Sequence, residues 1–105
     1  MVKKIRLSLD YDTYCVYYYE DDRMIANDLP PEWQNDHELW LAFCYISEFY
    51  DENYFSYNGW EMQEVGCSEE KQREFKEMID VALEFLAKKN KAGKYVIENL
   101  LYENI

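Results

Sequence analysis

The chain has 105 residues, of which 49% are hydrophobic and 18% aromatic, and its formal net charge is −11. This length fits one compact domain, and the aromatic content excludes an intrinsically disordered chain. The acidic balance argues against direct binding of DNA or RNA, and no apolar run reaches the roughly 18 residues of a membrane-spanning helix.

The N-terminal part of the chain has the pattern of a β-hairpin. Residues 4–9 alternate between polar and apolar side chains, which predicts a half-buried strand. The residues DYDT at 10–13 favour a turn, and 14–20, YCVYYYE, are almost all aromatic or β-branched, as in a second strand. The residues EDDR at 20–23 end that strand, so we expect two antiparallel strands in this region.

A helix is predicted over residues 36–50. Pro30 and Pro31 interrupt any regular structure before it, and Asn35 with Glu38 three residues later resembles a capping box. The apolar stripe of this helix consists of Leu39, Phe43, Ile46 and Tyr50. Residues 51–67 contain Asn58–Gly59 and Gly66, so they predict a loop with a short extended piece at 60–65.

A second helix begins after Ser68, whose side chain is a suitable N-cap, and Gly93 follows its last turn. Its apolar stripe is predicted to form core and consists of Phe75, Met78, Ile79, Ala82, Phe85 and Leu86. The final apolar segment at 95–102 predicts a third strand. The order β-β-α-α-β over residues 1–105 predicts a single two-layer α+β domain, with two helices on one face of a three-stranded, mainly antiparallel sheet.

The excess negative charge lies in the middle of the chain. No Lys or Arg occurs between Met24 and Glu70, whereas eleven of the 22 acidic residues do. The remaining eleven acids are balanced by the eleven bases outside that segment, so the middle carries the whole net charge. This segment is either a solvated acidic face or a surface that meets a basic partner.

An aromatic run interleaved with acids, EFYDENYFSYNGWE at 48–61, is the strongest candidate for a functional surface. Phe49 and Phe55 are predicted to cover the core. Tyr and Trp supply large contact area at low entropic cost, and carboxylates steer a basic partner. The predicted partner-binding residues are Glu48, Tyr50, Asp51, Glu52, Tyr54, Tyr57, Trp60 and Glu61.

No catalytic or metal-binding pattern stands out in the sequence. There is no glycine-rich phosphate loop or cluster of zinc ligands, and the segment beginning at Asp51 lacks the glycine of a calcium loop. The three cysteines, at 15, 44 and 67, are odd in number and form no C-x-x-C motif, so free thiols in a reducing compartment are expected. The alternating N-terminal segment does not resemble a signal peptide. We therefore expect a cytoplasmic, non-enzymatic protein with no cofactor or metal.

The segments IRLSLDYDTYCVYYYED and NDLPPEW, followed by a helix that carries Trp40, resemble small bacterial immunity proteins of toxin–immunity systems, including contact-dependent growth inhibition. The shared layout is an N-terminal hairpin, a D-L-P motif, an aromatic-rich helix, a loop, a second helix and a last strand. This resemblance implies a protein that blocks a cognate toxin in the cytoplasm of the producing cell. The acidic, aromatic-rich surface predicts that the toxin domain is basic, as a nuclease would be, and we expect a monomer or a weak dimer.

A second class of function stays open at this point. Small acidic phage proteins inhibit nucleic-acid-binding proteins of the host by placing carboxylates where DNA has phosphates. The predicted second helix mixes acids with Lys71, Arg73 and Lys76, which is more typical of a solvated face. Strand addition at the hairpin edge, near Asp21 and Asp22, is the alternative mode of partner recognition.

Overall fold

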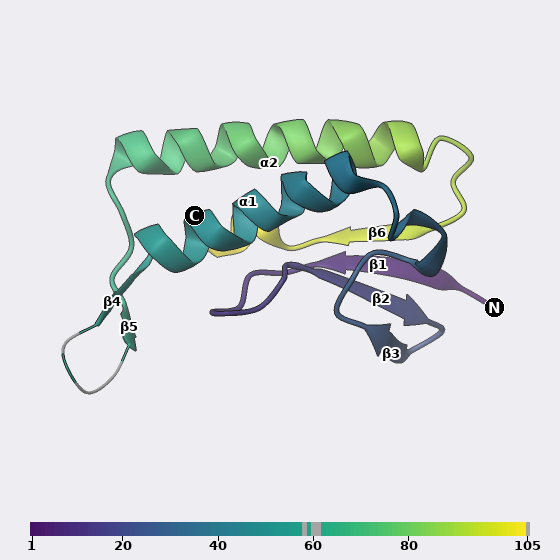
Figure 1. Cartoon of the computed structure of the whole chain (residues 1–105), viewed down its shortest axis with the longest axis horizontal. Coiled ribbons are helices and arrows are strands. Elements are labelled where there is room, and N and C mark those ends of the chain that lie inside the picture. The colour runs from purple at the N-terminus through teal and green to yellow at the C-terminus, as the bar shows by residue number, and fades with distance from the viewer. Residues whose placement is uncertain (58, 60–61, 105) are drawn as a thin grey trace.

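The computed structural model describes residues 1–57, 59 and 62–104. Two helices lie on one face of a mixed four-stranded sheet with strand order β3-β2-β1-β6, which confirms the α+β class (Figure 1). The strands of this sheet are β1 (Lys3–Leu7), β2 (Val16–Glu20), β3 (Arg23–Ala26) and β6 (Val96–Asn99). The helices are α1 (His37–Asn53) and α2 (Glu69–Lys89). A separate two-stranded hairpin consists of β4 (Phe55–Tyr57) and β5 (Met62–Glu64), and short 3-10 helices span Pro31–Trp33 and Leu101–Asn104.

The sheet differs from the prediction in two ways. The antiparallel pairing of β1 with β2 is as expected, but β2 also pairs with β3, a strand that the sequence did not predict. Strand β3 has only four residues, all at least partly exposed, so it lacks the alternation of a half-buried strand. The last strand, β6, lies parallel to β1, because the two helices return the chain to the end of the sheet at which β1 begins.

Helix α1 begins one residue later and ends three residues later than predicted. Asp36, not Asn35, is the N-cap: its Oδ1 atom accepts a hydrogen bond from the Leu39 N–H at 3.1 Å. The Asp36 Oδ2 atom also forms an ion pair with Lys89 of α2 at 2.9 Å. At the other end the helix continues through Asn53, since no Pro or Gly interrupts it before the Asn58–Gly59 turn signal. Residues 51–53, predicted as loop, are therefore helical.

Replacing Asp36 by alanine should lower the free energy of unfolding by about 1 kcal/mol at neutral pH, because an orphan N–H of α1 loses its acceptor. Hydrogen bonds from Lys89 and the Leu39 N–H lower the pKa of Asp36. A carboxyl whose folded pKa is lowered stabilises above its unfolded pKa of about 4, and this contribution is lost as the pH falls through the folded pKa. Urea denaturation at pH 7 and at about pH 3 should show a larger difference at the higher pH.

Asn35→Ala is the matched control for this substitution, since Asn35 is the neighbouring residue that the sequence pattern favoured as cap. We expect it to change the free energy of unfolding by less than about 0.5 kcal/mol. A larger loss for Asn35→Ala than for Asp36→Ala would mean that the helix begins one residue earlier.

Helix α2 follows its predicted N-cap, and most of its predicted stripe is buried. The Ser68 hydroxyl accepts a hydrogen bond from the Lys71 N–H at 3.3 Å. Phe75, Ile79, Ala82 and Leu86 are buried as predicted, and Met78 is partly buried. Phe85 is 40% exposed, so its assignment to the core was wrong. It precedes Leu86, which occupies the buried side, and a rotation of about 100° per residue carries Phe85 onto the flank of the helix.

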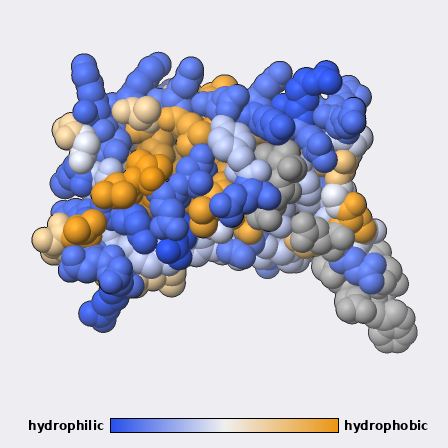
Figure 2. Space-filling view, turned by 180° about the vertical axis from the view of Figure 1, so that it is seen from behind, coloured by the Kyte–Doolittle hydropathy of each residue, from blue (hydrophilic) through white to orange (hydrophobic). Residues whose placement is uncertain are grey.

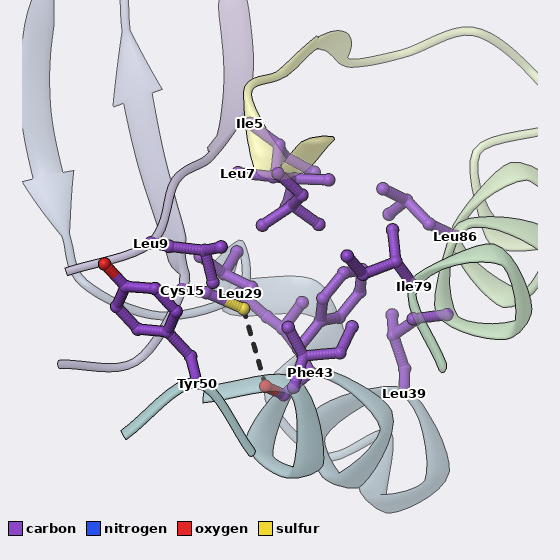
Figure 3. Close-up of a cluster of buried hydrophobic side chains, with 14 of the residues drawn as sticks. Ile5, Leu7, Leu9, Cys15, Leu29, Leu39, Phe43, Tyr50, Ile79 and Leu86 are labelled. Atoms are coloured by element: carbon purple, nitrogen blue, oxygen red, sulfur yellow. Dashed lines mark hydrogen bonds between the residues drawn. The ribbon is translucent and has the colours of Figure 1, made fainter. Parts of the chain in front are cut away.

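The core fills the space between the sheet and the two helices (Figure 3). Ile5 and Leu7 of β1 point toward Leu39 and Phe43 of α1, while Ile79 and Leu86 enter from α2. The predicted stripe of α1, consisting of Leu39, Phe43, Ile46 and Tyr50, is entirely buried. The helical periodicity of that segment therefore identified its core face correctly.

The opposite face of the sheet carries a cluster of paired charges. Glu98 of β6 forms ion pairs with Lys4 at 3.1 Å and Arg6 at 3.2 Å, and both cations lie over the ring of Tyr19. From behind, Figure 2 shows apolar side chains gathered over β6 and below the C-terminal half of α2. Val96, in that edge strand, is 55% exposed. Lys4, Arg6 and Glu98 on the outer face of the sheet are thus paired with one another.

Candidate functional site

An acidic cleft of about 380 Å³ lies along one flank of α1. Its other walls come from the loop between β1 and β2 and from the residues that follow β3. The residues that line it are Asp12, Thr13, Tyr14, Asn27, Asp28, Trp40, Cys44, Ser47, Glu48 and Asp51. We call this site the acidic cleft.

Helix α1 places a row of side chains along the cleft. Trp40, Cys44 and Glu48 are spaced four residues apart, and Asp51 follows three residues later. In an α-helix this spacing puts side chains above one another on one flank. The same helix turns Phe43 toward the core, so core packing fixes the orientation of the row.

An aromatic wall closes one side of the acidic cleft. The rings of Tyr14 and Trp40 are stacked, with centroids 5.9 Å apart and an interplanar angle of 26°. The Tyr14 hydroxyl donates a hydrogen bond to the Trp40 carbonyl oxygen at 3.1 Å. Burial raises the pKa of Tyr14 far above its usual range, and nearby groups including Asp28 add to this effect. The wall is therefore neutral and held in place by its own hydrogen bond.

Two hydrogen bonds hold the loop walls of the cleft against the rest of the protein. The Asp12 N–H donates to Asp51 Oδ1 at 3.0 Å, which ties the β1–β2 loop to α1. Asp12 has φ of 57°, a left-handed conformation that Asp tolerates better than most residues. The Asn27 amide donates to the Tyr14 carbonyl oxygen at 2.6 Å, so the segment after β3 is tied to the start of β2. The three segments thus form one preformed site.

The cleft concentrates negative charge. Four carboxylates line it, and none of its lining residues among those that the structure describes is a Lys or Arg. Burial raises the pKa of Asp51; the hydrogen bond from Asp12 opposes that shift, while the carboxylates of Asp12, Glu48 and Glu52 add to it. Because the negative charges repel one another here, a bound cation would relieve an unfavourable interaction.

The chemistry of Cys44 does not suit a nucleophile. Burial raises the pKa of its thiol, and the neighbouring Glu48 carboxylate, whose Oε1 atom lies 3.7 Å from Sγ, raises it further. A reactive thiol needs the opposite environment, one that stabilises the thiolate. Within the described part of the chain, no group of three or more His, Cys, Asp or Glu residues is arranged to hold a metal ion. No helix in that part is both long and apolar enough to span a bilayer.

The predicted partner-binding residues separate into three groups. Glu48 and Asp51 line the acidic cleft, and Glu52 is exposed beside it. Tyr50 and Tyr54 are only 4% and 2% exposed, which corrects their prediction as surface anchors. Both pack in the core because α1 continues to Asn53 and turns their rings inward. The ring of Tyr50 contacts Phe55, and the ring of Tyr54 contacts Phe75.

The remaining predicted residues are described only in part. Tyr57 belongs to β4, but its side chain is not described. Trp60 and Glu61 lie outside the described residues.

Part of the acidic middle segment is neutralised by lysines from the C-terminal half of the chain. Glu32 pairs with Lys94 at 3.0 Å and also accepts a hydrogen bond from the Tyr95 hydroxyl, and these contacts lower the pKa of Glu32. Asp36 pairs with Lys89, as described above. The segment that has no base in its sequence therefore has bases beside it in space at Glu32 and Asp36, whereas none of the described residues that line the acidic cleft is a Lys or Arg.

Several cleft residues were not predicted as site residues, including Asp12, Tyr14, Asp28 and Trp40. The spacing of residues 40, 44 and 48 was a signal that could have grouped Trp40 with Glu48 on one flank of the helix. No local pattern joins Asp12 or Asp28 to them, since both come from other segments of the fold. Comparison of the chain with models of known protein families, with characterised proteins and with solved structures gave no match.

Proposed function

We propose that this protein is an immunity-type inhibitor that binds a basic toxin domain, such as a nuclease, through the acidic cleft. The observation that carries the proposal is the convergence of Asp12, Asp28, Glu48 and Asp51 from three segments on one preformed cleft with no basic lining residue among those described. A cluster of uncompensated carboxylates attracts a cationic surface and accelerates association with it.

The aromatic wall makes the cleft suitable for an arginine or lysine side chain of the partner. Tyr14 and Trp40 both line the cleft, and a guanidinium group that stacks on such rings gains a cation–π interaction. The carboxylates of Glu48 and Asp51 lie on the same flank of α1 as Trp40 and would form ion pairs with the same group. Tyr14 and Trp40 thus take the anchoring role first assigned to Tyr50 and Tyr54. The predicted roles of Glu52, Tyr57, Trp60 and Glu61 stay predictions.

The test is a kinetic measurement of binding to a catalytically inactive basic toxin domain encoded beside the gene for this chain. The double variant Asp12→Asn with Glu48→Gln removes two charges from the cleft and keeps the shape of both side chains, and Asn also tolerates the left-handed backbone at position 12. We expect association to slow about tenfold at low salt, and less at high ionic strength where surface charges are screened.

The matched control removes the same number of charges elsewhere. Glu84 and Glu103 are exposed and line no part of the cleft, so Glu84→Gln with Glu103→Gln should have a much smaller effect on association. Equal slowing by both double variants would mean that only net charge matters. Loss of binding on substitution of Asp21 or Asp22, with the cleft variant unaffected, would assign recognition to the edge of the hairpin.

A further inference from the structure

An apolar groove runs between α1 and α2 on the outer face of the helix layer. It consists of two adjoining clefts of about 370 Å³ and about 300 Å³ that share Val81. Three of its large side chains are strongly exposed: Tyr45 at 55%, Val81 at 50% and Phe85 at 40%. We call it the helix groove; its lining residues are Glu38, Leu41, Ala42, Tyr45, Phe49, Glu74, Glu77, Met78, Val81 and Phe85.

The helix groove and the acidic cleft lie on opposite flanks of α1. Ala42, Tyr45 and Phe49 line the groove, whereas Trp40, Cys44 and Glu48 line the cleft. The two helices run antiparallel, since Asp36 pairs with Lys89 near one end and Phe49 stacks on Phe75 near the other. A partner in the groove would therefore leave the cleft open.

The charges on α2 are self-complementary about Val81. Glu74 lies seven residues before Val81, and Lys88 lies seven residues after it. Seven residues are about two helical turns, so all three side chains lie on nearly the same side of α2. If α2 packs antiparallel on a second α2 with the twofold axis at Val81, Glu74 of each copy meets Lys88 of the other. Met78 of one copy and Phe85 of the other then lie nearly opposite each other, and they extend the apolar centre of the interface around Val81.

Both charged groups are available for such pairing. Lys88 forms no ion pair with any other residue that the structure describes. Glu74 pairs with Lys71 at 3.3 Å, but both side chains are about half exposed, and exposed pairs of this kind contribute little. A closed twofold interface uses the same patch on both copies, as this arrangement requires.

We propose that the helix groove is the interface of a reversible homodimer, in which two antiparallel α2 helices pack about Val81 and form two Glu74–Lys88 pairs. The dimer presents two acidic cleft sites that both remain open. Tyr45 of α1 lies level with Val81 of α2 in the groove, so the same twofold axis also sets the two α1 helices antiparallel to each other. Glu38 and Glu52 lie seven residues before and after Tyr45, and Glu38 of one copy therefore comes near Glu52 of the other. These like charges, together with the net charge of −11 on each copy, oppose association and keep it reversible.

Sedimentation equilibrium of the full chain over the micromolar to millimolar range tests the proposal. We expect the mean mass to rise with concentration from 12.8 kDa towards twice that value. Val81→Glu should give a monomer at all concentrations, and Glu74→Lys and Lys88→Glu should each weaken the dimer at least about tenfold. General charge repulsion predicts the opposite for Glu74→Lys, because that change reduces the net negative charge.

A mixture of the two single variants separates specific pairing from damage to the fold. Glu74→Lys carries lysine at both positions and Lys88→Glu carries glutamate at both, so a mixed dimer regains two ion pairs while neither variant pairs with itself. We expect the equimolar mixture to dimerise nearly as well as the unmodified protein. Monomer throughout for the unmodified chain, or a mixture no better associated than its components, would overturn the proposal. A monomeric chain whose toxin binding is lost in Val81→Glu would instead assign the groove to the partner.

Discussion

Phe43→Ala should lower the free energy of unfolding by about 3–5 kcal/mol, because a large, fully buried aromatic side chain is lost from the centre of the core. Phe43 lies where α1 meets the sheet, close to Ile5 and Leu7 of β1 (Figure 3). The loss includes both transfer of the ring to water and the cavity left behind, since neighbours on three elements relax only partly. Urea denaturation with linear extrapolation measures it.

Phe85→Ala is the matched control, since it removes the same ring from a position that is 40% exposed. We expect a loss below about 1 kcal/mol, because much of the ring is already in water and alanine favours the helix. The measurement should be made at low protein concentration, where association through the helix groove does not contribute. Equal losses of unfolding free energy for the two variants would contradict the position of Phe85 on the exposed flank of α2.

Ser47→Ala should cost about 1–3 kcal/mol, a large effect for the loss of one oxygen atom. Ser47 is 8% exposed, and its hydroxyl joins two elements: it accepts from the Cys15 N–H at 3.0 Å and donates to the Phe43 carbonyl oxygen at 3.0 Å. In the variant the Cys15 N–H stays buried without its acceptor, and an unsatisfied buried donor bears its full desolvation cost. Thermal or urea unfolding would measure the difference.

Ser56→Ala removes the same oxygen from an exposed residue of β4 and should change stability by less than about 0.5 kcal/mol. If Ser47→Ala were equally mild, either water would reach the Cys15 N–H in the variant or the backbone at Cys15 would move to a new acceptor. Amide hydrogen exchange at Cys15 distinguishes a retained structure from a rearranged one, since exchange reports local opening.

The helices could be predicted because their signals are local. The buried stripe of α1 follows from side chains three and four residues apart, and Ser68 with the acids after it marks the start of α2. The N-cap of α1 was misplaced by one residue because Asn35 and Asp36 are both good caps. Asp36 has the additional ion pair with Lys89, which is distant in sequence and favours Asp36 over Asn35 at this position.

The sheet could be predicted only in part, because strand pairing joins distant segments. Strand β3 is short and exposed, so it gives almost no periodic signal, and its existence depends on the turn at Asp21, where φ is 55°. The parallel pairing of β6 with β1 depends on where the two helices return the chain. The apolar character of residues 95–102 indicated a strand but could not indicate its direction.

The candidate site shows how two sequence signals can conflict. Tyr50 belongs both to the helical stripe with Phe43 and Ile46 and to the aromatic run that suggested a binding surface; the structure follows the stripe. Glu48 and Asp51, predicted as partner-binding residues, line the acidic cleft because they lie on another flank of the same helix; that they bind a partner stays a prediction. Asp12 and Asp28 reach the cleft through the hairpin and the segment after it, and only the assembled fold brings them there.

The pairing of β1 with β6 also bears on how this chain reaches its folded state. Arg6 and Glu98 are 92 residues apart in sequence, yet they are register partners and form a side-chain hydrogen bond at 3.2 Å. Closing so long a loop is entropically costly, and contacts of this kind slow folding. While residue 96 of a nascent chain is still inside the ribosome, β6 is not available, and β1 can pair only with β2. Completion of the central sheet must therefore follow synthesis of both helices, whereas the β1–β2–β3 meander, built from local pairs, is free to form long before it.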